Sequence, residues 1–204
     1  MKRKNAILLG FLGLALLDGM FAFVKPIDFT CTSLSIVWHF YLTGLLVFVC
    51  DKPALTRFLI GLAAGMFYDA FVAGTVLINM ILFGLLALLS GLFGVMLRPT
   101  GRKAAWIVFL VFVSDALPFA IGQARGIETV SWGSWLYHME LLTLIFSALI
   151  VIGILYVDMV MSRYYLFQSR YTGAGRIRSY APHVRAANRN HPVKQAEARR
   201  SKRR

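Results

Sequence analysis

The chain has 204 residues, of which 58% are hydrophobic and 15% charged, and its mean hydropathy is +0.68. Because the apolar residues form long blocks, this composition excludes an ordinary soluble domain and predicts an all-α polytopic membrane protein. The blocks are about 20 residues long and lack the alternation of barrel strands, so the spanning elements are expected to be helices.

The positive charge is concentrated at the C-terminal end of the chain. Residues 163–204 hold 12 of the 22 Lys and Arg residues and a single acid, Glu197, and therefore carry +11 of the net charge of +13. This segment has too few apolar residues to fold alone, so we predict a basic cytoplasmic tail that is mostly disordered after about Tyr171. Such a tail helps to fix topology and can contact anionic lipid head groups. A basic tail also binds phosphates, but we do not expect nucleic acid as a partner.

Residues 1–162 are predicted to form a transmembrane domain of six helices. The N-terminus resembles a signal peptide, but its apolar run continues past Asp18 to Val24 with no small-x-small cleavage site, so we expect an uncleaved first span. Pro118 lies inside the fifth span and is expected to kink it. The six spans are expected at about 6–24, 33–50, 55–73, 75–97, 104–122 and 135–157.

The Lys and Arg residues of the short loops predict that both chain ends are cytoplasmic. In this orientation the outer loops hold only Lys25 and Arg125, whereas the opposite orientation would place the whole basic tail outside. The inner segments before the tail hold the other cations, which are Lys2, Arg3, Lys4, Lys52, Arg57, Arg98, Arg102 and Lys103.

The longest apolar stretch, residues 58–97, contains one acidic side chain, Asp69, and no basic one. Its length suits two spans, and Gly74 lies where a tight turn is expected, because glycine adopts backbone angles that other residues resist. Gly61, Gly65 and Asp69 follow one another at intervals of four and share one helix face. Small residues at this spacing let another helix approach closely in lipid. We therefore interpret this face as a surface for helix packing or for a partner protein.

Five further polar residues lie within or near the predicted spans. An unpaired carboxylate in hydrocarbon costs several kcal/mol, so the acids are expected to face one another, face a histidine or line a wet outward cavity. Lys25 and Arg125 in the outer loops could also pair with them. Two interpretations stay open: hydrogen bonding that fixes helix packing, and an outward pocket for a proton or a ligand. The five residues are Asp18, His39, Asp115, His138 and Glu140.

The sequence contains no motif that predicts catalysis or metal binding. It has no Gly-rich phosphate loop, no paired-His metal motif and no Ser or Cys in a nucleophile motif. We therefore expect neither an enzyme nor a cofactor nor a metal site. Cys31 and Cys50 flank the second predicted span and, if that span is helical, lie roughly 28 Å apart, which is too far for a disulfide.

Residues 65–69 read GMFYD and are followed by Gly74 and Asn79. This arrangement resembles the signature of the rod shape-determining MreD family, in which a Gly-x-x-x-Asp ends one span and a glycine turn leads into the next. Tyr68 is similar to the Tyr that precedes the Asp in versions from Gram-positive bacteria. Asn79 is expected to hydrogen-bond back across the turn. The chain departs from the family at residues 77–78, where many members carry a second glycine, and in its longer, more basic tail.

The resemblance implies a non-enzymatic scaffold in the bacterial cytoplasmic membrane that supports cell shape and peptidoglycan synthesis. The implied partner is MreC and, through it, MreB, RodA and a class B penicillin-binding protein. The fold of the family is similar to the S component of energy-coupling-factor transporters, so the alternative is a vitamin-like small-molecule binding subunit of a transporter. S components usually carry Ala-x-x-x-Ala on their first span, and this chain has only Ala15-x-x-x-Gly19, so we favour the scaffold.

Overall fold

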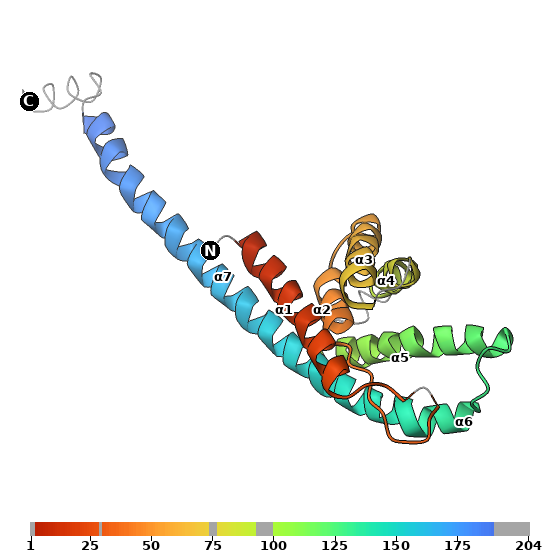
Figure 1. Ribbon diagram of the computed structural model, residues 1–204. Coiled ribbons are helices and arrows are strands. Elements are labelled where there is room, and N and C mark those ends of the chain that lie inside the picture. Colours follow the sequence, from red (N-terminus) through yellow and green to blue (C-terminus); the bar gives the residue numbers. More distant parts are fainter. Residues whose placement is uncertain (1–2, 29, 74–76, 93–99, 190–204) are drawn as a thin grey trace, which may run out of the picture. The chain divides into compact units, whose positions relative to one another are not determined.

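A computed structural model describes residues 3–28, 30–73, 77–92 and 100–189 of the chain. All regular structure in these ranges is helical (Figure 1), which confirms the all-α prediction for the described residues. The chain divides into two units, Met1–Tyr156 and Val157–Arg204, and α7 contributes residues to both. The elements are α1 (Arg3–Val24), α2 (Phe40–Val49), α3 (Ala54–Tyr68), η1 (Asp69–Ala73), α4 (Ile78–Leu89), α5 (Thr100–Ala124), α6 (Trp132–Trp135), η2 (Leu136–Glu140) and α7 (Leu141–Arg189), where η marks a π-helical turn.

Among the described residues, four segments are long and apolar enough to cross a membrane: Ile7–Val24, Ala54–Ala73, Thr100–Ala124 and Trp132–Tyr165. Two further apolar helices are shorter: α2 has 10 residues and α4 has 12. At 1.5 Å per residue these helices are about 15 and 18 Å long, against about 30 Å for a hydrocarbon core. The structure therefore supports four candidate membrane-spanning helices, and the count of six stays a prediction.

The second predicted span begins later than the sequence indicates. Helix α2 starts at Phe40, and the residues before it are not helical. This segment bonds to the C-terminal part of the first unit instead: the Ser35 N–H donates to the His138 carbonyl at 2.8 Å, and the Val37 N–H donates to Thr143 Oγ1 at 3.0 Å. Its backbone groups thus find partners without helix formation, which is why hydrophobicity alone placed the helix start too early.

Helix α2 is the most deeply buried element of the first unit. Leu45, Leu46 and Val49 are fully enclosed, and the helix packs against α1, α3, α4 and α5. Leu86 of α4 and Ile107 of α5 belong to the same apolar cluster. A helix that is apolar on all sides is expected at the centre of a bundle, and α2 occupies that place.

Helices α3 and α4 approach each other through glycines. A Cβ atom at Gly61 would lie 2.7 Å from the Ala87 Cβ, and one at Gly65 would lie 2.6 Å from the Met80 Cα. Both distances are shorter than a van der Waals contact, so only glycine fits at these positions. Of the two roles that the sequence leaves open for this helix face, the structure shows packing within the chain. Gly74 lies outside the described residues.

Helix α7 continues further than the sequence predicts. Residues 172–189, for which the sequence predicts disorder, are helical in the structure, and residues 190–204 lie outside the described part of the chain. The Ala and Arg residues of this segment favour a helix, whereas Gly173, Gly175 and Pro182 do not, and the mostly disordered tail stays a prediction.

We expect the Gly65→Ala substitution to lower the free energy of unfolding by about 1–3 kcal/mol, because the added methyl group collides with the α4 backbone. The control is Gly13→Ala on α1, where a Cβ meets nothing within 4 Å. Both changes carry the same gain in helix propensity, so the difference between them isolates packing. Denaturant unfolding of the full chain in detergent micelles would measure it, and equal stabilities would contradict the close approach of α3 and α4.

Candidate functional site

The carboxylate of Asp18, on α1, holds the first turn of α2. Its Oδ1 accepts the Phe40 N–H at 2.7 Å and its Oδ2 accepts the Tyr41 N–H at 2.9 Å. The first N–H groups of a helix have no partner within the helix, and leaving them unbonded in apolar surroundings is costly. Asp18 is only 3% exposed. Its carboxylate lies at the N-terminus of α2, where the helix dipole favours a negative charge.

The carboxylate of Asp69 bonds the first turn of α4. Asp69 is the first residue of the π-helical turn η1, and its carboxylate accepts the Met80 N–H at 2.9 Å and the Asn79 N–H at 3.2 Å. The Asn79 side chain adds a third bond, from Nδ2 to Asp69 Oδ1 at 2.8 Å, which is the bond back across the turn that the sequence predicts. Leu77, just before α4, has a φ of 61°, an unusual backbone angle for a residue with a side chain.

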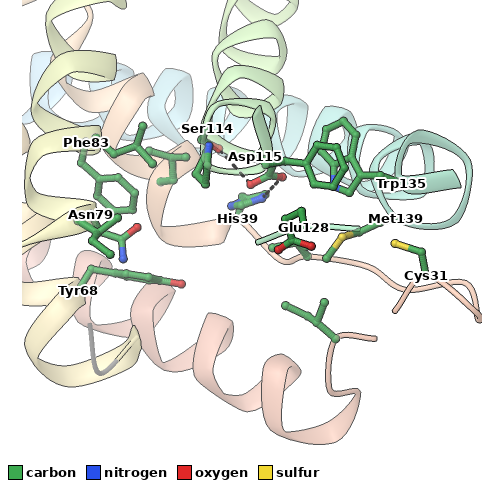
Figure 2. Close-up of a pocket in the computed structure, with 17 residues that line it drawn as sticks. Cys31, His39, Tyr68, Asn79, Phe83, Ser114, Asp115, Glu128, Trp135 and Met139 are labelled. Atoms are coloured by element: carbon green, nitrogen blue, oxygen red, sulfur yellow. Dashed lines mark hydrogen bonds and ion pairs between the residues drawn. The ribbon is translucent and has the colours of Figure 1, made fainter. Parts of the chain in front are cut away.

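His39 and Asp115 form a polar pair between the start of α2 and the middle of α5. His39 Nε2 lies 2.8 Å from Asp115 Oδ2, as Figure 2 shows. The Ser114 hydroxyl lies 3.4 Å from the other Asp115 oxygen and donates a shorter bond, 2.6 Å, to the Val111 carbonyl. One oxygen of Asp115 is therefore firmly held by the imidazole, whereas the other is only weakly engaged.

Glu140 is the last residue of the π-helical turn η2 and is fully buried. Neither of its carboxyl oxygens has a hydrogen-bond partner among the described residues. Asp115 and His39 lie within electrostatic range of it. The structure thus gathers three of the five predicted intramembrane polar residues, Glu140, Asp115 and His39, into one region.

The other members of the predicted polar network have different neighbours. Asp18 lies within electrostatic range of His39 but is bonded to the α2 backbone. His138 Nδ1 bonds to the Ser134 carbonyl one turn earlier, at 3.0 Å. Within the described residues the ion pairs are His39–Asp115 and Lys103–Asp51, so the structure shows neither Lys25 nor Arg125 in the pairings that the sequence suggested.

A cavity of about 450 Å³ lies beside the His39–Asp115 pair. Figure 2 shows Tyr68, Asn79 and Phe83 on one side of the pair, and Trp135 and Met139 on the other. The wall of the cavity is mostly apolar and carries a few polar groups, which is typical of small-molecule sites. The polar side chains among the described residues that line it are those of Cys31, His39, Tyr68, Asn79, Ser114, Asp115 and Glu128.

Glu128 is a lining residue that the sequence does not reveal. It lies in the loop after α5, where Gly126 has a φ of +68° and the Gly122 carbonyl accepts the Ile127 and Glu128 N–H groups. A Cβ at Gly122 would lie 2.6 Å from the Glu128 Cγ, so the glycine leaves room for the acid to fold back. The only sequence signal is the Gly-x-Glu that follows the span, which does not specify this direction.

The loop before α2 is fixed by Asp28, close to the lining residue Cys31. The Asp28 carboxylate accepts bonds from the hydroxyls of Thr30, Thr32 and Ser33 and from the backbone N–H groups of the same residues. The bonds from Thr30, followed by those from Thr32 and Ser33, hold the pKa of Asp28 well below its ordinary value. The carboxylate therefore stays charged, and the loop stays bonded, at any pH near neutrality.

The chain matches no protein-family model, and comparison with curated proteins and with solved structures also finds no match. The resemblance to the MreD family therefore stays a prediction from residues 65–79. The cavity wall holds two acidic residues, Asp115 and Glu128, while the buried Asp18 and Asp69 bond the first N–H groups of α2 and α4. Among the described residues no group of three or more metal-ligating side chains is present.

We expect Asp18→Ala and Asp69→Ala each to lower the free energy of unfolding by about 1–2 kcal/mol, because each removes the acceptor for two N–H groups at a helix start. The Asp18→Asn variant keeps one side-chain oxygen and should lose less. Asp158→Ala, at an exposed position of α7, is the matched control. Urea titration in detergent would compare them, and a stability loss no larger than that of the control would contradict the capping role.

Proposed function

We propose that this chain is a non-enzymatic scaffold of the bacterial cell-elongation complex. In this proposal it lies in the cytoplasmic membrane with six crossings and both ends inside, and it supports cell shape and peptidoglycan synthesis by binding MreC. MreB, RodA and a class B penicillin-binding protein would be reached through MreC. Anionic lipids would meet the basic residues after 163.

The observation that carries this proposal is the construction of the α3–α4 hairpin. Gly65 lies against the α4 backbone, and Asp69, four residues on, holds the N-terminus of α4. The Gly-x-x-x-Asp pattern that resembles the MreD signature thus has a physical role, since each of its two defined residues fixes one contact between the same two helices. A hairpin fixed at two points is a rigid surface for a second membrane protein.

The placement of these residues changes how the partner would be recognised. Because α4 covers Gly61 and Gly65, MreC would not contact the glycines themselves but the outer surface of the hairpin that they shape. Large apolar side chains are exposed on that surface, among them Met66 and Ile81. Exposed apolar residues on a membrane helix meet either lipid or a partner helix.

We expect Gly65→Leu and Asp69→Ala to reduce recovery of MreC by about tenfold or more, because both distort the hairpin. A tenfold loss corresponds to about 1.4 kcal/mol, within the range of a disrupted helix contact. Pull-down of MreC with the tagged full chain from solubilised membranes would measure this. Gly13→Leu is the matched control, since Gly13 faces open space. Unchanged MreC recovery from both hairpin variants, at equal membrane content, would refute the proposal.

A second candidate function is the vitamin-like small-molecule binding subunit of a transporter. The observation that favours it is the cavity of about 450 Å³, which falls within the range of about 300–1,000 Å³ typical of ligand sites. Under this alternative, the purified chain should bind a vitamin tightly and should co-purify with a transporter ATPase instead of MreC. Calorimetric titration with a panel of vitamins would decide, and absence of binding across the panel would remove this candidate.

A further inference from the structure

We propose that the cavity beside His39 and Asp115 binds a small organic cation, namely an amine with an apolar body, and that Asp115 is its anionic contact. This inference goes beyond the scaffold function and does not rest on it. It also names a ligand class for the cavity that the transporter alternative invokes, although binding of an amine requires no transport.

The charge of the cavity wall favours a cation. Two carboxylates, Asp115 and Glu128, are among the described residues that line the cavity, and none of these lining residues is Lys or Arg. The one basic group, His39, is already bonded to Asp115. Negative charge with few cations around it, enclosed by apolar walls, attracts a positively charged ligand more strongly than the same charge in water.

Asp115 has the geometry to receive an ammonium group. A carboxylate offers about four lone-pair sites, and His39 occupies one of them at 2.8 Å. The Ser114 hydroxyl, at 3.4 Å from the second oxygen, is long for a hydrogen bond and has its own acceptor in Val111. His39 therefore orients the carboxylate of this lining residue and leaves its second oxygen only weakly engaged.

Glu140 is a further buried acid near the cavity residue Asp115. It is fully buried, neither of its oxygens has a partner among the described residues, and it lies within electrostatic range of Asp115. A buried carboxyl group without partners is costly. A cation bound at Asp115 would favour the ionised form of Glu140 through space, without contacting Glu140, which is not itself a lining residue.

The shape and chemistry of the remaining wall indicate an organic cation in place of a metal ion. Tyr68, Phe83, Phe119 and Trp135 line the cavity, and aromatic rings attract ammonium groups through their faces. The volume of about 450 Å³ accommodates a molecule with an apolar body. Among the described residues no group of three or more His, Cys, Asp or Glu side chains is placed to hold a metal.

The experiment is isothermal titration of the full chain in neutral detergent with 2-phenylethylamine and with its uncharged analogue 2-phenylethanol. Titration of detergent alone corrects for partitioning into micelles. We expect the amine to bind at least about tenfold more tightly than the alcohol, which is the discrimination expected of a charge-assisted hydrogen bond. Equal affinity for the two probes, or no binding of the amine, would overturn the inference.

Variants of Asp115, Asp51 and Glu128 test whether the amine binds in this cavity. Asp115→Asn should weaken binding of the amine about tenfold or more and leave that of the alcohol unchanged, whereas the matched Asp51→Asn, at an exposed position outside the cavity, should change neither. If Asp115→Asn does not fold, Glu128→Lys in the loop after α5 decides, because it introduces a cation into the wall and should abolish amine binding. Unchanged amine affinity in the folded variants would refute the assignment. MreC recovery is measured separately, so failure here is distinct from failure of the scaffold proposal.

Discussion

The structure depends on one constraint: the first N–H groups of a helix enclosed by apolar side chains must find acceptors. Asp18 supplies them for α2, and Asp69 supplies them for α4. Asp18 lies in the C-terminal half of α1 and Asp69 directly follows α3, so each fixes the start of a short helix relative to the helix before it. The first of these contacts satisfies the N-terminal N–H groups of α2, which lets this apolar helix lie within the apolar cluster of the first unit.

The same contacts also determine where the cavity forms. Because α2 begins at Phe40, the preceding residue, His39, is outside the helix and its ring reaches Asp115 of α5. Because α4 begins beside Asp69, its first turn brings Asn79 to the opposite side of the cavity. Asp18 and Asp69 thus bond helix starts, whereas Asp115 bonds His39 and the Glu140 carboxyl has no hydrogen-bond partner among the described residues.

The sequence predicts α1, α3 and α5 well, but the start of α2 and the extent of α7 poorly. Continuous apolar runs define α1, α3 and α5, and the Gly61–Gly65 spacing predicts a close helix contact, although not which helix provides it. The start of α2 is not predictable from hydrophobicity, since it depends on Asp18, more than 20 residues away in the chain. The position of Glu128 in the cavity wall is not predictable for a similar reason. The direction of its side chain is determined by a glycine turn and by the space left at Gly122, and neither feature has a periodic sequence signal.

The two π-helical turns have a consequence for how this protein can diverge. Each lies at one of the buried acids, since η1 begins with Asp69 and η2 ends with Glu140. A π turn holds one residue more than an α turn, and each residue turns a helix by about 100°. Loss of a single codon within η2, which lies between α6 and α7, would restore a regular helix and rotate these two helices against each other. Loss of one within η1, which ends its helix, would instead shorten the connection from Asp69 to Asn79. Length changes at these turns, more than amino-acid replacements, would therefore reorganise the site in a single evolutionary step.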